Sequence, residues 1–144
     1  MMGPKEECEK LMDVLLPFAL QMLERYGEFY PFGGMITRDG KIVQIGAMDD
    51  DMDHPKSQPL IDTMVSTFRE KAKNGDCRAT GIVVDVKVVP PDRAEKVDAI
   101  QLRMDHHDGY SVEVFFPYER RGKNIEVQPA FASKGSSLIF EQVQ

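Results

Sequence analysis

The sequence predicts an α+β fold, with one antiparallel sheet of about five to seven strands and two helices packed on one face of it. Three observations carry this prediction. Apolar residues recur at intervals of three and four in two segments, they alternate with polar residues in several others, and short glycine-containing turns join neighbouring strands. The predicted order is α-β-β-α-β-β-β with one or two further strands, in a single domain covering residues 1–144.

Two segments have the periodicity of amphipathic helices. The first covers residues 5–26, and Gly27 is a suitable stop. Pro17 lies inside it and is expected to kink or split the helix, because proline removes a backbone hydrogen bond. The second covers residues 59–74 and ends before Gly75. The apolar face of the first helix consists of Leu11, Leu15, Phe18, Met22 and Tyr26, and that of the second of Leu60, Ile61, Met64, Phe68 and Ala72.

The remaining segments read as strands. Asp39-Gly40 favours a tight hairpin between the first two, since glycine readily adopts a positive backbone φ. Pro90 and Pro91 end the third strand, which is rich in valine and isoleucine. The predicted strands cover residues 33–38, 41–47, 79–89, 97–106, 110–118, 124–131 and 137–142.

The hairpin that joins residues 97–106 to 110–118 has a predictable register. Apolar residues occupy the even positions of both strands, so facing them toward one core requires even residues to pair with even residues. A three-residue loop, 107–109, satisfies this condition, with Gly109 in the left-handed conformation. The register then pairs Met104 with Val112, Leu102 with Val114 and Arg103 with Glu113, and leaves Phe115 on the outer face.

Composition narrows the class of protein. The formal net charge of −6 argues against nucleic-acid binding and against attachment to anionic membranes, both of which use clustered lysine and arginine. Cys8 and Cys77 read as free thiols in a reducing compartment. The apolar stretch 14–20 follows acidic residues and is too short to span a bilayer, so the expected location is the cytoplasm.

The acidic run 49–53 partly matches a calcium-binding loop. Asp49, Asp51 and Asp53 occupy its first three ligand positions, but His54 and Leu60 stand where glycine and a bidentate glutamate are required. We therefore expect a solvated loop and no metal. No cofactor is predicted either, because Gly33-Gly34 enters a strand instead of opening a helix as a phosphate-binding loop would. A close backbone approach or a bulge explains those two glycines better.

Titratable residues give weak candidates for chemistry. His106 and His107 are neighbours on a strand, so we expect them to point to opposite faces and not to share a metal. Arg78 could favour a thiolate at Cys77, but a half-buried, unreactive thiol at the start of a strand is the simpler interpretation. Arg120, Arg121 and Lys123 read as a solvated turn. His106 and Tyr110 are the candidate ligand-binding residues.

Two similar words, residues 29–32 and 115–118, each consist of two aromatic residues, a proline and a third aromatic residue. Packing at the rim of the core is the first interpretation of them. Exposed rings that anchor a partner protein are the second, because aromatic residues are enriched at binding hot spots. Together with acidic residues that could attract a basic partner, the candidate partner-binding residues are Phe29, Tyr30, Phe32, Phe115, Tyr118, Asp50 and Asp51.

The word Glu28-Phe29-Tyr30-Pro31-Phe32-Gly33, followed by an Asp39-Gly40 hairpin and a later Pro117-Tyr118, resembles a pattern in small bacterial proteins of unknown function. This resemblance extends over most of the chain and implies no catalytic residues. Its size and acidity are also those of immunity proteins that block toxins, which is an analogy and not a motif match.

The sequence therefore favours a non-enzymatic protein-interaction domain, of immunity or regulatory type, that binds a protein partner or a second copy of itself. The alternative is a small-molecule-binding module or minor enzyme. That alternative requires a cavity between helices and sheet, near His106, Tyr110 or Tyr118.

Overall fold

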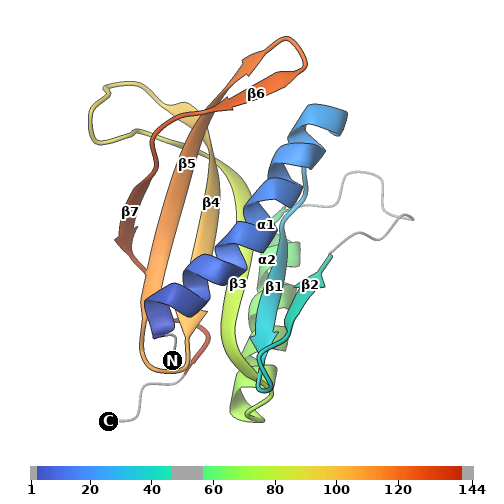
Figure 1. Ribbon diagram of the computed structural model, residues 1–144. Helices are drawn as coiled ribbons and strands as arrows, with labels where there is room; N and C mark the ends of the chain where they lie inside the picture. The colour runs from blue at the N-terminus through green and yellow to red at the C-terminus, as the bar shows by residue number, and fades with distance from the viewer. Residues whose placement is uncertain (1–2, 47–56, 141–144) are drawn as a thin grey trace.

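The computed structural model describes residues 3–46 and 57–140 and confirms the α+β class (Figure 1). Two helices accompany an antiparallel sheet of seven strands. In chain order the elements are α1 (Pro4–Tyr26), β1 (Phe32–Thr37), β2 (Ile42–Ile45), α2 (Ser57–Lys73), β3 (Cys77–Val88), β4 (Val97–His106), β5 (Ser111–Arg121), β6 (Asn124–Val127) and β7 (Phe131–Lys134).

The strands lie in the order β2-β1-β3-β4-β5-β6, and β7 also pairs with β5. The long strand β5 thus has two partners on the same edge: β7 pairs with residues 112–115 and β6 with residues 118–121. Hydrogen-bonded hairpins connect β1 to β2, β3 to β4 and β4 to β5 (Figure 1).

The predicted register of the β4–β5 hairpin is confirmed. Met104 pairs with Val112, Leu102 with Val114 and Arg103 with Glu113. His106 N–H donates to Tyr110 C=O across the three-residue loop, at 2.8 Å, and Gly109 has a φ of 90°. The Asp39-Gly40 turn between β1 and β2 is confirmed as well, with Gly40 at a φ of 89°.

Helix α1 is continuous, so the predicted splitting at Pro17 is wrong. Leu15 and Ala19, on either side of the proline, are fully buried against the sheet, whereas Pro17 itself is exposed. Packing of the buried face holds both halves of the helix in line, and water can solvate the backbone carbonyl that Pro17 leaves without an N–H donor. The helix ends as expected, where Gly27 N–H bonds to Leu23 C=O with a φ of 77°.

The prediction that both helices pack on one face of the sheet is wrong. Val83 of β3 packs in the core beneath α1, whereas its neighbours Ile82 and Val84 pack beneath α2. Successive strand residues point to opposite faces, so the two helices lie on opposite sides of the sheet, α1 in front and α2 behind in Figure 1.

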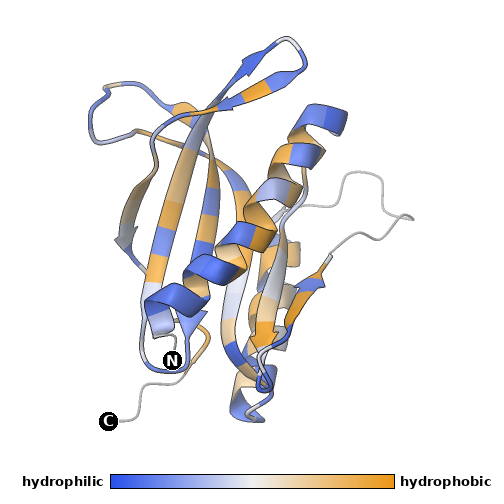
Figure 2. Cartoon of the chain, in the orientation of Figure 1, coloured by the Kyte–Doolittle hydropathy of each residue, from blue (hydrophilic) through white to orange (hydrophobic). Residues whose placement is uncertain are grey.

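Topology explains this arrangement. Strands β2 and β3 flank β1 and both run antiparallel to it, so they are parallel to each other. The segment containing α2 is therefore a crossover connection, which must pass over one face of β1. Helix α1 covers the other face, and its middle turns are apolar while both ends are hydrophilic (Figure 2).

Glycines let the helices approach the sheet closely, as expected for Gly33-Gly34. Gly34 and Gly81 are paired across β1 and β3, and a Cβ on either one would lie within 3 Å of a Leu15 methyl group. Gly33 faces the other way, and its Cβ would lie 3.2 Å from the ring of Phe68 on α2. Leu15 and Phe68 thus press on the same part of the sheet from opposite sides.

Two predicted strands near the C-terminus are corrected. Residues 124–131 contain the whole of β6, a connection at 128–130 and the first residue of β7 instead of a single strand, because Pro129 lacks an N–H to continue the ladder. Residues 137–140 are not a strand; they cross the sheet so that Ile139 packs in the core beneath α2. Neither helix in the described ranges combines the length and apolar character needed to cross a bilayer.

We predict that Gly81→Ala destabilises the protein by about 1–3 kcal/mol, because the added methyl group overlaps Leu15 and Met104. Urea unfolding measures the loss. Gly46→Ala is the matched control, since no atom of the described residues lies within 4 Å of a Cβ at that position. Equal stabilities of the two variants would show that the close approach of α1 is unnecessary.

Candidate functional site

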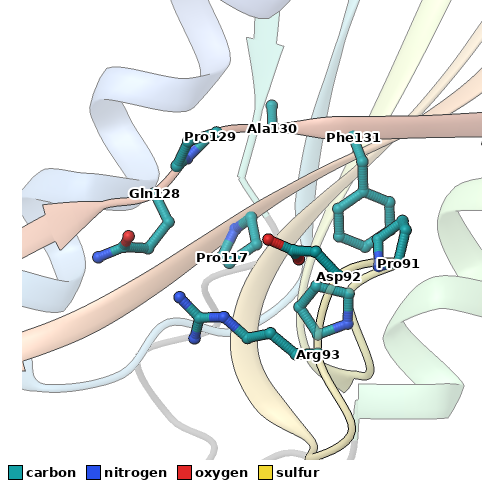
Figure 3. Close-up of a pocket in the computed structure, with 9 residues that line it drawn as sticks. Pro91, Asp92, Arg93, Pro117, Gln128, Pro129, Ala130 and Phe131 are labelled. Atoms are coloured by element: carbon teal, nitrogen blue, oxygen red, sulfur yellow. The ribbon is translucent and has the colours of Figure 1, made fainter.

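An apolar recess lies at one end of the sheet, where the β3–β4 loop, β5 and the β6–β7 connection meet. Its volume is about 230 Å³. Gln128 N–H donates to Pro117 C=O at 2.8 Å, which holds the β6–β7 connection against β5. Figure 3 shows the side chains that converge on this apolar recess, which is lined by Pro90, Pro91, Asp92, Arg93, Pro117, Gln128, Pro129, Ala130 and Phe131.

A stacked aromatic pair adjoins the recess. Phe115 on β5 and Phe131 on β7 are register partners, with ring centroids 4.9 Å apart and planes 12° from parallel. Both rings are half-buried. Odd-numbered residues of β5 share one face, so Phe115 lies on the face opposite α1, as the alternation predicted. Both rings therefore keep part of their surface accessible on that face.

Most of the other rings of the two aromatic words belong to the core. Phe29, Phe32 and Tyr118 are each at most 6% exposed and share one apolar cluster. Phe32 makes edge-to-face contacts with Phe29 and Phe18, and Tyr118 O–H donates to Asp85 at 2.8 Å. The packing interpretation therefore holds for these three rings. Tyr30 is half-buried.

A second, polar recess of about 190 Å³ lies on the same face of the sheet, further along β5. Its floor comes from alternating residues of β4 and β5, and the chain crosses over it at residues 135–138. A Cβ on Gly135 would lie 2.1 Å from Ser111 Oγ, so only glycine allows this crossing. The polar recess is lined by Arg103, Asp105, Ser111, Val112, Glu113, Gly135, Ser136, Ser137 and Leu138.

In the polar recess, Arg103 and Glu113 neutralise each other, whereas Asp105 has no cationic partner among the described residues. Gln101 donates to Glu113 at 3.1 Å and accepts from Arg103 at 3.2 Å, and Arg103 Nε lies 4.0 Å from Glu113. The predicted Arg103–Glu113 pair is thus present and linked through Gln101. Asp105 accepts one hydrogen bond, from Ser111 Oγ at 2.7 Å, and no cationic group of the described residues lies within ion-pair distance of it.

Burial raises the pKa of the Asp105 carboxyl above its usual value, and the neighbouring Glu113 carboxylate adds to the effect, while the Ser111 hydrogen bond opposes it. Only 9% of Asp105 is exposed. Its cross-strand neighbour Thr80 is fully buried on the same face, and the Thr80 hydroxyl has no hydrogen-bond partner in the described structure. These polar groups were missed in the sequence, where they appear only as the outward positions of alternating strands.

His106 is a structural residue. Its Nε2 lies 3.0 Å from Glu7 Oε1, and its Nδ1 accepts the Asp108 backbone N–H at 3.1 Å. The proton therefore belongs on Nε2, which donates to Glu7. Arg78 binds the same Glu7 oxygen at 3.1 Å. With both ring nitrogens occupied, His106 is not free to act as a general base. Tyr110, the other candidate ligand-binding residue, packs against the core beneath α1.

The expectation that His106 and His107 diverge is wrong. Their rings stack at a centroid distance of 4.7 Å, because the strand ends at His106 and His107 already belongs to the turn. Potential metal-binding atoms of His106, His107 and Asp108 consequently lie within 4.8 Å of one another. A metal ion there would have to displace the Asp108 N–H from His106 Nδ1.

A third recess, of about 310 Å³, lies beside His107. It is bordered by Arg69 and Lys73, whose positive charges disfavour the binding of a cation.

The two thiols are poor nucleophiles. Cys8 and Cys77 are buried, and burial is the main reason that the pKa of Cys8 rises to about 12 and that of Cys77 to about 11. Both therefore stay protonated at neutral pH, which agrees with the interpretation of Cys77 as an unreactive thiol.

Two of the candidate partner-binding residues, Asp50 and Asp51, lie outside the described residues. No family model, curated protein or solved structure matches this chain.

Glu7→Ala is predicted to cost about 3 kcal/mol of stability, because it leaves the buried His106 N–H and the Arg78 guanidinium without their shared acceptor. Glu6→Ala is the control, since Glu6 is exposed on the same helical turn. The difference between the two variants in urea unfolding isolates the buried interaction, and a difference near zero would contradict it.

Asp105→Asn should stabilise the protein at pH 7, since asparagine keeps an acceptor for Ser111 and carries no buried charge. The folded-state pKa of Asp105 is raised, so ionisation of this carboxyl costs folding free energy above that pKa. The cost vanishes as pH falls below about 3.9, where the unfolded chain also holds the proton. The advantage of the variant, measured by urea unfolding across pH, should shrink accordingly; a constant advantage would show that Asp105 ionisation is not its source.

Proposed function

We propose that this protein is a non-enzymatic protein-interaction domain that binds its partner through the face of β5 and β7 opposite α1. The observation that carries the proposal is the apolar recess beside the half-buried Phe115–Phe131 pair. Binding hot spots typically combine an aromatic anchor with a well-packed pocket, and this surface offers both.

The size of the recess supports a protein ligand. Small-molecule sites usually measure about 300–1,000 Å³, whereas this recess of about 230 Å³ suits one large apolar side chain. Prolines and a backbone hydrogen bond build its walls, so little conformational entropy is lost when the recess is filled. A single side chain inserted there would extend over the adjacent Phe115–Phe131 pair.

The titratable groups also favour binding over catalysis. His106 has both ring nitrogens engaged, and the two thiols are buried with raised pKa values. The cavity that the enzyme alternative requires was expected near His106, Tyr110 or Tyr118, and the recesses described above are lined by other residues. Free, buried thiols support a cytoplasmic location. An immunity or regulatory protein of bacterial origin fits this interpretation.

A phage-displayed library of random short peptides tests the proposal without a known partner. The protein is expected to select peptides that carry a large aromatic or aliphatic residue. Phe131→Ser removes a wall of the recess and should reduce the affinity of the selected peptides at least about tenfold, the typical effect of losing a hot-spot residue. Isothermal titration calorimetry of synthetic peptides measures the change.

Val43→Ser is the matched control, because Val43 is a comparably exposed apolar residue on β2, at the other edge of the sheet. Urea unfolding should show that both variants remain folded. Selection of the same peptides with unchanged affinity by Phe131→Ser would refute the proposed surface. Sedimentation velocity separates the two kinds of partner: if the partner is a second copy, the wild-type protein dimerises and Phe115→Ser is a monomer.

A further inference from the structure

We propose that the polar recess binds a cationic side chain, the guanidinium or ammonium group of an arginine or lysine in the partner protein. This inference rests on the proposed function, and it names the chemistry that the partner must present. Its elements are the recess volume of about 190 Å³, the unpaired charge of Asp105 and the position of the recess on the same strand face as Phe115.

The charges in the recess leave one carboxylate without a counter-ion. Arg103 and Glu113 offset each other through Gln101. Among the residues that the structure describes, Asp105 receives only the hydroxyl of Ser111, whose oxygen in turn accepts the Ser137 backbone N–H at 3.1 Å. An ionised Asp105 therefore gives the recess a net negative charge. Because Asp105 itself is nine-tenths buried, its carboxylate attracts a cation more strongly than an exposed carboxylate would.

An unsatisfied polar group lies next to Asp105, behind the residues that line the recess. Thr80 is paired with Asp105 across β3 and β4, faces the same side of the sheet, and has a buried hydroxyl oxygen without a partner in the described ranges. Buried hydroxyl groups without hydrogen bonds are uncommon in native proteins and call for an explanation. Thr80 is fully buried and does not line the recess, so it adds to the polar surroundings of Asp105 without supplying a counter-charge.

An unpaired buried carboxylate costs folding stability, as the raised pKa of Asp105 indicates. A core position under no other constraint would be better filled by an apolar or amide residue. The cost is understandable if the carboxylate is used in a complex, where a cation from the partner neutralises it.

The two recesses form one continuous binding surface. Residues 111, 113, 115 and 117 of β5 share a face, and they lead from the polar recess to the apolar recess. Four residues of strand separate the centres of the two, which corresponds to about 13 Å at about 3.3 Å per residue. An extended ligand would therefore place its basic residue about four positions from its apolar anchor.

The same display selection tests this inference. Peptides selected by the wild-type protein should carry arginine or lysine about four positions from the apolar anchor, and Asp105→Asn should weaken their binding about tenfold or more. Affinity of a peptide with alanine at the basic position should be the same for wild type and variant. Glu24→Gln is the control for net charge, since Glu24 is exposed on α1, on the opposite side of the sheet.

Nα-acetyl-arginine amide and its neutral isostere Nα-acetyl-citrulline amide provide a second, independent measurement. In amide-detected NMR titrations, the arginine compound should shift the signals of residues 105, 111 and 113 in the wild-type protein but not in Asp105→Asn. The citrulline compound should leave them unchanged.

The outcomes distinguish the two proposals. Apolar consensus peptides without a basic residue, or equal NMR shifts with both amides, would overturn the cation site and leave the interaction surface intact. Failure to select any peptide would overturn the interaction surface, and the NMR titration would still decide whether the recess prefers a cation.

Discussion

The packing of Leu15 onto the glycine pair Gly34 and Gly81 is the constraint on which the rest of the structure depends. A methyl group on either glycine would push α1 away from the sheet, so the pair fixes the helix over the junction of β1 and β3. On the opposite side, a Cβ at Gly33 would overlap the backbone oxygen of Gly81 and come within 3.2 Å of the Phe68 ring on α2. The centre of the sheet is therefore enclosed by helices on both faces, and each helix has one position in which it packs without overlap.

This arrangement decides which part of the sheet stays open. Helix α2 contacts β1 and β3 and leaves the same face of β4, β5 and β7 without a helix. Within residues 3–46 and 57–140, only the segment 135–140 crosses there, anchored by Ile139 beneath α2. The polar outer residues of β4 and β5 consequently lie in a recess instead of in bulk water. The polar recess thus follows from the position of α2 over β1 and β3, which leaves this face of β4 and β5 to the crossing segment.

Local patterns predicted the local structure well. The alternation of apolar and polar residues in two segments, together with Gly109, predicted the β4–β5 register and the outer position of Phe115. Both depend only on the two-residue period of a strand and on a short loop. The break at Pro129 also follows from a local property, the missing N–H of proline, and it contradicts the prediction of a single strand over residues 124–131. The placement of α2 is different in kind, since it depends on which strands flank β1, and the spacing of apolar residues carries no such information. One sign was present: β3 reads Gly81-Ile82-Val83-Val84 without alternation, which is typical of a strand buried on both faces.

The candidate site was only half predictable for the same reason. Phe115 could be identified because an aromatic residue stood at a polar position of the pattern. Asp105 and Ser111 could not, because acidic and hydroxyl residues are ordinary at outward positions, and the crossing segment 135–138 that closes over them is distant in sequence. A raised pKa arises from that long-range contact and has no local signature.

The chemistry along β5 finally argues for one ligand instead of two separate ones. Its outer residues change from proline and phenylalanine, at positions 117 and 115, to glutamate and serine at positions 113 and 111. All four belong to one strand that is hydrogen-bonded on both sides, so the distance between the apolar and the acidic ends is fixed before any ligand arrives. A rigid spacing of this kind selects partners that present an apolar and a basic group at the matching separation, and it does so with little loss of conformational entropy in the protein. Affinity would come mainly from the apolar end and discrimination from the acidic end, because an uncharged group placed beside Asp105 would leave the buried carboxylate unpaired.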